Sequence, residues 1–304
     1  MHDIIVIGGG PAGLTAAVYG LRNGKSVLVI ERNVFGGQIV NSPKVENIPG
    51  FDVISGDEFG DRFLEQAMGQ GADVTLEEVT GVRRESCFFV DTAEGSTYEA
   101  RAVILATGTT HRMLGLPGEE DLVGNGISFC AVCDGDFYRG KKVVMIGGGN
   151  SAFVEAALLV EIVDELIMLQ DLPFFTADQK SQEQLFAHDN VTTHTDTKIL
   201  GYVVEDGKLA GVRYAEGGEE NVEFCDGVFL AVGLVPENSA FTNVADTNEA
   251  GYFDADESCL TATPGVFVAG DCRKKTLRQV ATACADGAQA AVAACDYLRE
   301  IEKA

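Results

Sequence analysis

Two segments of the chain show the same succession of apolar and polar positions. In the first, an apolar run at residues 4–7 precedes a glycine-rich turn, a helical periodicity that reaches Asn23 and an apolar run at 27–30. In the second, a run at 143–146 precedes another glycine-rich turn, a helical pattern and an apolar run at 166–169. Strand, glycine turn, helix and strand in this order predict a βαβ unit. The sequence therefore predicts an α/β fold with two such units.

The first glycine turn, Gly-Gly-Gly-Pro-Ala-Gly at residues 8–13, has the spacing of a dinucleotide-binding motif. Gly8 permits the tight turn, Gly10 lets the backbone approach a pyrophosphate, and Gly13 lets helix and strand pack closely. Glu31 stands at the end of the second strand, where a carboxylate can accept hydrogen bonds from an adenosine ribose. The alternative for Glu31 is a solvated carboxylate at a strand end.

Length and composition limit the classes of protein that fit. A chain of 304 residues with 46% hydrophobic residues and 36 glycines fits two compact α/β units. No apolar run is long enough to span a membrane, and no leader-like segment precedes the first strand, so we expect a soluble, cytoplasmic protein. The formal charge of −25 argues against nucleic acid as a partner, because phosphate backbones are bound by clustered Lys and Arg.

Two of the eight cysteines, Cys130 and Cys133, form a CxxC motif that is followed by Asp134. A zinc site would need a second pair of ligands, and the four histidines offer no such motif, so we expect no metal. As a redox pair, two thiols at this spacing can close a disulfide, and the motif lowers the thiol pKa. We expect the other six cysteines to be buried free thiols: Cys87, Cys225, Cys259, Cys272, Cys284 and Cys295.

Five further motifs occur in a consistent order along the chain: Gly36-Gly37-Gln38, then residues 45–50, 106–108, 265–271 and 278–280. Together they resemble the low-molecular-weight thioredoxin reductases over nearly the whole chain. The resemblance implies two Rossmann-like domains and FAD in the first of them. It also implies a discontinuous FAD domain, 1–112 with 243–304, into which an NAD(P)-type domain, 113–242, is inserted.

The resemblance also implies the residues that contact FAD. Asp271 would hydrogen-bond the ribityl or pyrophosphate region, Gln279 and Val280 would lie beside the isoalloxazine, and Asn47 would face the flavin. The full set of candidates is Gly8, Gly10, Pro11, Ala12, Gly13, Glu31, Arg32, Gly37, Gln38, Asn47, Ala106, Thr107, Gly108, Asp271, Arg278, Gln279 and Val280.

For the CxxC pair, the resemblance implies that Cys133 takes electrons from reduced flavin and that Cys130 attacks the disulfide of thioredoxin. Asp134 would move protons as a general acid and base, although it could instead only cap a helix. A homodimer, and a domain rotation that shows the pair alternately to flavin and substrate, are implied in the same way.

The motif that binds the 2′-phosphate of NADPH in this family, HRRxxxR, is absent. The corresponding residues 170–176 read Gln-Asp-Leu-Pro-Phe-Phe-Thr, and no Lys, Arg or His lies between Lys142 and Lys180. Asp171 favours an unphosphorylated ribose and hence NADH, but the position that matches Glu31 is Gln170. The apolar residues 172–175 are suited to filling a pocket.

We therefore expect the second glycine turn to be a structural remnant and reduced ferredoxin to be the electron donor, as in the ferredoxin-dependent flavin thioredoxin reductases that the sequence resembles. Ferredoxins are usually acidic, so a local basic patch would have to offset the net charge. Residues 273–275 with Arg278 form the densest basic cluster, which could equally help to neutralise a pyrophosphate. The alternatives are a NADH- or NADPH-dependent thioredoxin reductase, a dithiol oxidase that uses oxygen, and a non-catalytic flavin-binding module.

Overall fold

The computed structural model describes residues 1–42, 45 and 47–303, so Glu46 of the 45–50 motif lies outside the described residues. The chain forms two compact units: Met1–Thr110 with Val235–Ala304, and His111–Leu234. The two passages of the chain between the units, β7 (Thr109–His111) and β16 (Leu234–Pro236), pair as a two-stranded sheet.

The second passage lies earlier than the boundary expected at residue 242. The reason is the packing of the segment after β16. The 3₁₀ helix η3 (Ser239–Phe241) buries Phe241, and Val244 and Ala245 join the same hydrophobic cluster as β1 and β6 of the first unit. This segment is therefore part of the first unit.

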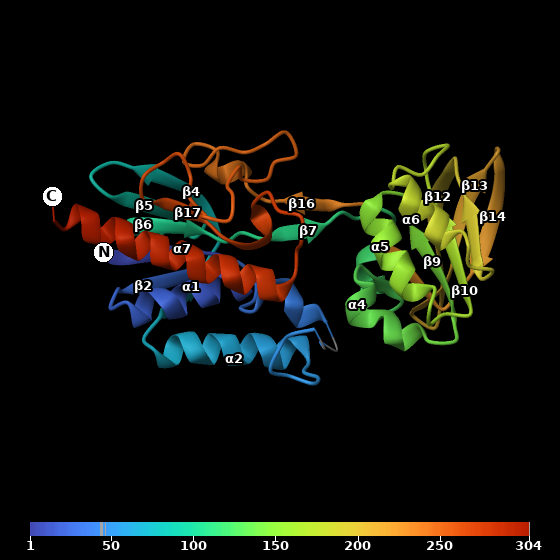
Figure 1. The fold of residues 1–304 in the computed structure, drawn as a ribbon, viewed down its shortest axis with the longest axis horizontal. Coiled ribbons are helices and arrows are strands. Elements are labelled where there is room, and N and C mark those ends of the chain that lie inside the picture. The colour runs from blue at the N-terminus through green and yellow to red at the C-terminus, as the bar shows by residue number, and fades with distance from the viewer. Residues whose placement is uncertain (43–44, 46, 304) are drawn as a thin grey trace. The chain divides into compact units, whose positions relative to one another are not determined.

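The first unit is built on a seven-stranded mixed sheet (Figure 1). Its central strands β3, β2, β1, β6 and β17 run parallel, and β5 and β4 continue the sheet antiparallel. The strands are β1 (His2–Ile7), β2 (Val27–Glu31), β3 (Asp73–Leu76), β4 (Val79–Arg84), β5 (Phe88–Thr92), β6 (Thr97–Leu105) and β17 (Val266–Val268). Apolar runs such as 4–7 are buried, as expected for strands covered on both faces.

Helices α1 (Pro11–Arg22) and α7 (Val280–Ile301) lie side by side in the first unit, and α2 (Gly56–Gly69) packs against α1 (Figure 1). Small residues allow the first pair to approach closely. A Cβ atom added at Gly287 of α7 would collide with the carbonyl oxygen of Ala12 in α1. The late helix α7 thus completes the packing around the first βαβ unit.

The second unit contains a five-stranded parallel sheet in the order β11-β10-β9-β15-β8 and a separate antiparallel sheet β12-β13-β14. The strands are β8 (Ile127–Ser128), β9 (Lys142–Ile146), β10 (Glu165–Leu169), β11 (Val191–His194), β12 (Thr197–Glu205), β13 (Lys208–Glu216), β14 (Glu219–Phe224) and β15 (Gly227–Leu230). The helices are α3 (Glu119–Leu122), α4 (Ala131–Asp134), α5 (Asn150–Leu159) and α6 (Gln179–Leu185), with 3₁₀ helix η2 (Gly135–Tyr138) after α4.

No helix in the described part of the chain combines the length and apolar character needed to cross a membrane. Four of the six cysteines outside the CxxC motif are buried thiols, in agreement with the sequence interpretation. Cys87 and Cys284 differ because they are only partly buried.

Candidate functional site

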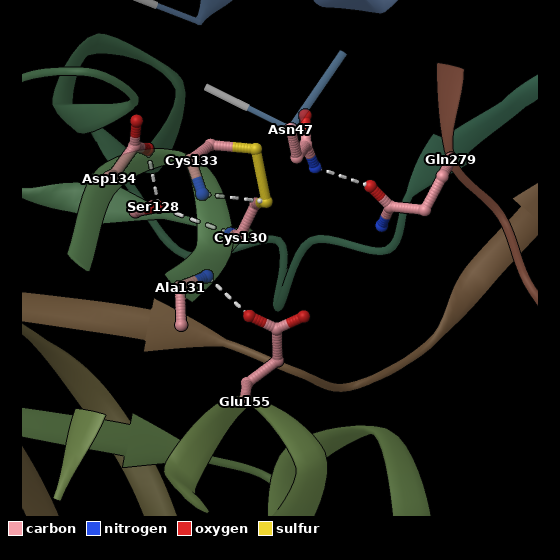
Figure 2. Close-up of a disulfide and its surroundings, with 8 residues drawn as sticks. All are labelled: Asn47, Ser128, Cys130, Ala131, Cys133, Asp134, Glu155 and Gln279. Carbon is pink, nitrogen blue, oxygen red and sulfur yellow. Dashed lines mark hydrogen bonds between the residues drawn. A yellow bond between two sulfur atoms is a disulfide. The ribbon is translucent and has the colours of Figure 1, made fainter. Parts of the chain in front are cut away.

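The CxxC pair forms a disulfide at the start of the short helix α4 in the second unit. Cys130 is the residue that caps α4, and its Cα atom lies 5.3 Å from that of Cys133. The Cys133 amide donates a hydrogen bond to Cys130 Sγ at 3.2 Å (Figure 2). An amide in this position can stabilise a thiolate on Cys130 once the disulfide is reduced. Within the described residues, no group of three or more His, Cys, Asp or Glu is arranged to hold a metal ion.

Asp134 is held beside the disulfide by a buried serine that the sequence analysis did not identify. Ser128, at the end of β8, donates to Asp134 Oδ2 at 2.6 Å and accepts from the Cys130 amide at 3.2 Å. Burial raises the pKa of Asp134, and the hydrogen bond from Ser128 acts in the opposite direction. Asp134 Oδ1 is buried without a hydrogen-bond partner among the described residues. A carboxyl group in this state can hold a proton near the pair.

Glu155 of α5 is a second carboxyl group at the pair, which the sequence analysis also missed. It accepts a hydrogen bond from the Ala131 amide, the first amide of α4 (Figure 2). Burial raises its pKa, and the negative charge of Asp134 acts in the same direction. Glu155 lies on the helix that follows the second glycine turn, and no local sequence pattern connects it with Cys130.

The first glycine turn forms a backbone cradle at the N-terminus of α1. Gly8 has φ +107°, and a Cβ atom there would collide with Ala106, the residue after β6. Gly10 is the N-cap of α1, where no side chain caps the helix, and Pro11 is the first helical residue. A Cβ atom at Gly10 would lie 3.8 Å from the Cα atom of Gly37. The uncapped amides at this end fit a pyrophosphate.

Glu31 closes one end of this cradle. Its two carboxylate oxygens accept hydrogen bonds from the amides of Gly9, at 2.7 Å, and Asn33, at 2.9 Å. Each oxygen keeps a lone pair, so the carboxylate can still receive a ribose hydroxyl. Arg32 forms an ion pair with Glu237, a residue that the sequence analysis did not select.

Asp271 lies in the 3₁₀ helix η4 (Gly270–Cys272), directly after β17. Burial raises its pKa, and the charges of Lys275 and Arg278 act in the opposite direction. Asp271 Oδ1 is buried and has no hydrogen-bond partner among the described residues, although Lys275 Nζ lies 3.8 Å away. An unpaired buried carboxylate oxygen is costly, so a hydroxyl group of a ligand fits this position.

The segment around Asp271 is fixed by an ion-pair network on Asp286 of α7, which the sequence analysis did not identify. Arg273 donates to both carboxylate oxygens of Asp286, at 2.8 and 2.9 Å, and Lys275 donates at 2.9 Å. The Gly270 amide also donates to Asp286 Oδ2, at 3.0 Å. These four bonds hold the turn that carries Asp271.

The remaining candidates of the first unit take part in contacts at the start of α7 and around the loop after β6. Asn47 donates to Gln279 Oε1 at 2.8 Å, and Gln279 caps α7, which begins at Val280. Gln38 donates to the carbonyl oxygen of Thr109. Thr107, between Ala106 and Gly108 in the loop after β6, donates to Asn238 at 2.8 Å, and Arg278 donates to the carbonyl oxygen of Asp271 at 3.3 Å.

The second glycine turn borders a cavity of about 800 Å³ within the second unit. This volume lies in the range of small-molecule and cofactor sites. The cavity is lined by backbone of residues 147–149, by Gln170 and Asp171, and by two cations that the sequence analysis missed, Arg112 and Lys198. Gln170 occupies the place that Glu31 has in the first module, since a Cβ atom at Gly148 would collide with its side chain.

The expectation that residues 172–175 fill this cavity is wrong. Leu172 and Phe174 are exposed, and Phe175 packs against Phe153 of α5 and Phe186. The reason is that Phe175 packs into this aromatic cluster, while the amide and the hydroxyl of Thr176 bond to the carbonyl oxygen of Gly148 and fix the end of the segment.

The basic cluster at 273–275 offers little positive surface. The side chains of Arg273 and Lys275 are only 3% and 5% exposed, since both bind Asp286. Lys274 is the exposed cation of residues 273–275. Arg278 stacks over Tyr252 with its guanidinium 4.3 Å from the ring centroid. The sequence does not show that the charged groups of Arg273 and Lys275 are buried inside the unit.

Comparison with known proteins gives consistent matches over the whole chain. Residues 2–287 match the family model of pyridine nucleotide-disulphide oxidoreductases. Thioredoxin reductases of Listeria monocytogenes and Bacillus subtilis are 40% and 38% identical, and each alignment covers 100% of this chain and 96% of the relative. The crystal structure of thioredoxin reductase from Streptococcus pyogenes matches with a TM-score of 0.88 and 35% identity over 99% of both chains. These matches confirm the α/β class with two Rossmann-type domains.

Proposed function

The chain belongs to the pyridine nucleotide-disulphide oxidoreductase family, and from this premise we propose that it is a FAD-dependent enzyme that reduces the disulfide of a thioredoxin. The observation that carries the proposal is the Cys130–Cys133 disulfide, which lies at a helix start beside the buried carboxyl of Asp134. The alignments with relatives named thioredoxin reductase cover 96% of each relative, and they support the choice of substrate. The proposal includes a cytoplasmic location and a homodimer. The family resemblance supports the homodimer, which light scattering of the purified protein can test.

Residues of the first unit would hold FAD. The α1 amides behind Gly10 would bind the pyrophosphate, Glu31 the adenosine ribose, and Asp271 a hydroxyl of the ribityl chain. Asn47 and Gln279, joined by a hydrogen bond, would face the ring system. When bound, FAD supplies the electron pair that reduces the disulfide.

Thiol chemistry then follows from the geometry of α4. After reduction, the Cys133 amide stabilises a thiolate on Cys130, which attacks one sulfur of the partner's disulfide and releases the other as a thiolate. Cys133 next attacks Cys130 Sγ, which closes the Cys130–Cys133 disulfide and releases the partner as a dithiol. Asp134, held by Ser128, gives the proton that the leaving thiolate needs and recovers one in the next cycle.

The proposed donor is reduced ferredoxin, because the segment 170–176 carries no cation for a 2′-phosphate. Each turnover would need two ferredoxins, since an iron–sulfur protein of this kind passes one electron and the disulfide needs two.

NADH is a second candidate donor, because the second glycine turn borders an open cavity of dinucleotide size. Asp171 lines this cavity where a 2′-phosphate would meet it, and an acidic residue there favours an unphosphorylated ribose. The scarcity of exposed cations at 273–275 also weakens the argument for an acidic protein donor.

Anaerobic mixing of the oxidised holoenzyme with each donor tests the proposal. We expect the flavin absorbance near 450 nm to bleach within the turnover time, roughly a second or less, with reduced ferredoxin or NADH, and at least about tenfold more slowly with NADPH. Stopped-flow absorbance at equal donor concentrations is the measurement. Fast bleaching by NADPH would contradict the donor assignment but would leave the disulfide chemistry untouched.

A charge reversal at Asp171 tests whether the cavity selects the nucleotide. In the Asp171→Arg variant we expect the preference for NADPH over NADH to rise by about tenfold or more, because a charged hydrogen bond to phosphate contributes roughly 1.5–3 kcal/mol. Isothermal titration calorimetry with both nucleotides is the measurement. Asp189→Arg, an exposed change outside the cavity lining, is the matched control. If neither the wild type nor Asp171→Arg binds NADH or NADPH, the cavity is not a nucleotide site. This result would favour ferredoxin as the donor.

A further inference from the structure

Glu155 stands out among the side chains at the disulfide because it is an anionic group bound to the redox helix from a different element. Its carboxylate comes from α5 and bonds to the Ala131 amide, next to Cys130 in the chain (Figure 2). A carboxylate beside a thiol that must ionise is unfavourable by charge alone, since like charges oppose ionisation. Its position therefore needs a reason other than stability of the thiolate.

The amides of α4 show what Glu155 changes. A helix start normally offers unpaired amides that lower the pKa of a cysteine. In α4, the Cys133 amide points to Cys130 Sγ at 3.2 Å, and the Asp134 amide bonds to the carbonyl oxygen of Cys130. The Ala131 amide is occupied by Glu155. The donor at Cys130 Sγ is therefore the Cys133 amide, while Glu155 brings a carboxyl group to the amide of the residue next to Cys130.

The surrounding elements carry little positive charge to offset Glu155. Asp134 on α4 repels it. Helix α6, packed on α5, carries the exposed Lys180 and Glu183, and β9 carries Lys142, which is held in two ion pairs. Among the described residues, the Ala131 amide is the hydrogen-bond donor found at the Glu155 carboxylate.

We propose that Glu155 is a positioning residue for Cys130: its carboxylate anchors the first amide of α4, and its negative charge limits the fraction of Cys130 present as thiolate. The inference rests on Cys130 being the attacking thiol of the proposed function. A limited thiolate fraction keeps the reduced pair from reacting with oxidants other than a docked partner, at the expense of intrinsic reactivity.

The test compares Glu155→Gln with Glu155→Ala in a Cys133→Ser background, in which Cys130 has no disulfide partner. Glutamine keeps the acceptor oxygen for the Ala131 amide but removes the charge, whereas alanine removes both. We expect the pH midpoint of Cys130 alkylation by iodoacetamide to fall by about one unit in Glu155→Gln, a tenfold change in thiolate at a pH below both midpoints. Mass spectrometry of the Cys130 peptide separates this thiol from the other cysteines, and Glu183→Gln is the control that should match the parent.

A merely structural role predicts a different result. Glu155→Gln would then titrate like the parent, and Glu155→Ala alone would differ, which would overturn the proposal. If the variants fail to fold, redox-difference infrared spectra of the wild-type holoenzyme, with and without ¹³C-labelled glutamate, decide the matter. A glutamate carboxyl band that shifts on disulfide reduction supports the proposal, and its absence refutes it. Because alkylation needs no thioredoxin, a wrong substrate assignment would leave this test intact.

Discussion

Replacement of Cys130 by serine is expected to lower the rate of partner-disulfide reduction by at least about a thousandfold, because a hydroxyl at this position cannot act as the nucleophile toward a disulfide. Flavin content should stay unchanged, since the glycine turn and Asp271 belong to the other compact unit. Thioredoxin-dependent reduction of a chromogenic disulfide, with equal flavin concentrations, is the measurement. Activity that survives this change would rule out the proposed mechanism.

Cys133→Ser is the companion variant, and it should fail in a different way. Its Cys130 can still attack the partner but cannot be released, so a mixed disulfide should accumulate and be visible by intact-mass analysis. Cys130→Ser should trap no partner under the same conditions. Cys87→Ser, which removes a partly buried thiol of the first unit, should behave as the wild type. Trapping by Cys130→Ser instead would reverse the assigned roles of the two cysteines.

The second large effect is expected at Asp286, whose loss should destabilise the first unit by about 3–5 kcal/mol. In Asp286→Asn the side chain keeps its shape but loses its charge, and the buried Arg273 and Lys275 lose their nearest counter-ion and keep only longer ion pairs, with Glu257 at 3.7 Å and with Asp271 at 3.8 Å. The turn that carries Asp271 should loosen, so flavin affinity should fall as well. Urea unfolding, followed by flavin fluorescence and by circular dichroism, measures both effects.

Asp254→Asn is the matched control, since it breaks an ion pair of the same loop region that is exposed. Asp254 and Lys274 are 62% and 68% exposed and 3.8 Å apart, so little change in stability is expected. If both variants unfold at the same urea concentration as the wild type, the buried network does not stabilise the unit.

The same network predicts a loss of stability in acid. Burial acts to raise the pKa of Asp286, but the hydrogen bonds and charges of Arg273 and Lys275 outweigh it, and the pKa is lowered from its ordinary 3.8. A lowered pKa stabilises the folded state at pH values above 3.8 and loses this contribution as the pH falls through the folded-state value. The difference in stability between wild type and Asp286→Asn should therefore shrink below about pH 4.

The parts of this protein that could be predicted from sequence are those set by neighbouring residues. The apolar run before Gly8 and the spacing to Gly13 determine a βαβ unit locally, and the close spacing of Cys130 and Cys133 permits a disulfide directly. Contacts set by packing carry no such signal. Glu155 lies 24 residues from Ala131, and Ser128 gives no hint that its hydroxyl would bind Asp134.

The burial of charged side chains and the lining of the cavity were the least predictable features, because both depend on which side of a turn faces the interior. Arg273 and Lys275 look like a surface patch in the sequence, but Asp286 binds both of them inside the unit. Lys198 lines the cavity of the second glycine turn from β12, and the elements α5, β10, α6 and β11 lie between that turn and β12 in the sequence. The absence of a basic motif at 170–176 therefore describes one wall of that cavity only.

The packing of α7 against α1 also determines the order in which this protein can mature on the ribosome. Strand β17 pairs with β6, and Gly270 lies against Ala12, so the first glycine turn is supported by residues that are synthesised after the inserted unit. The inserted unit, His111–Leu234, is continuous and can fold while α7 is still being made. The redox disulfide segment should thus be in place before any flavin is retained, and flavin loading should follow the folding of the inserted unit in the biogenesis of the enzyme.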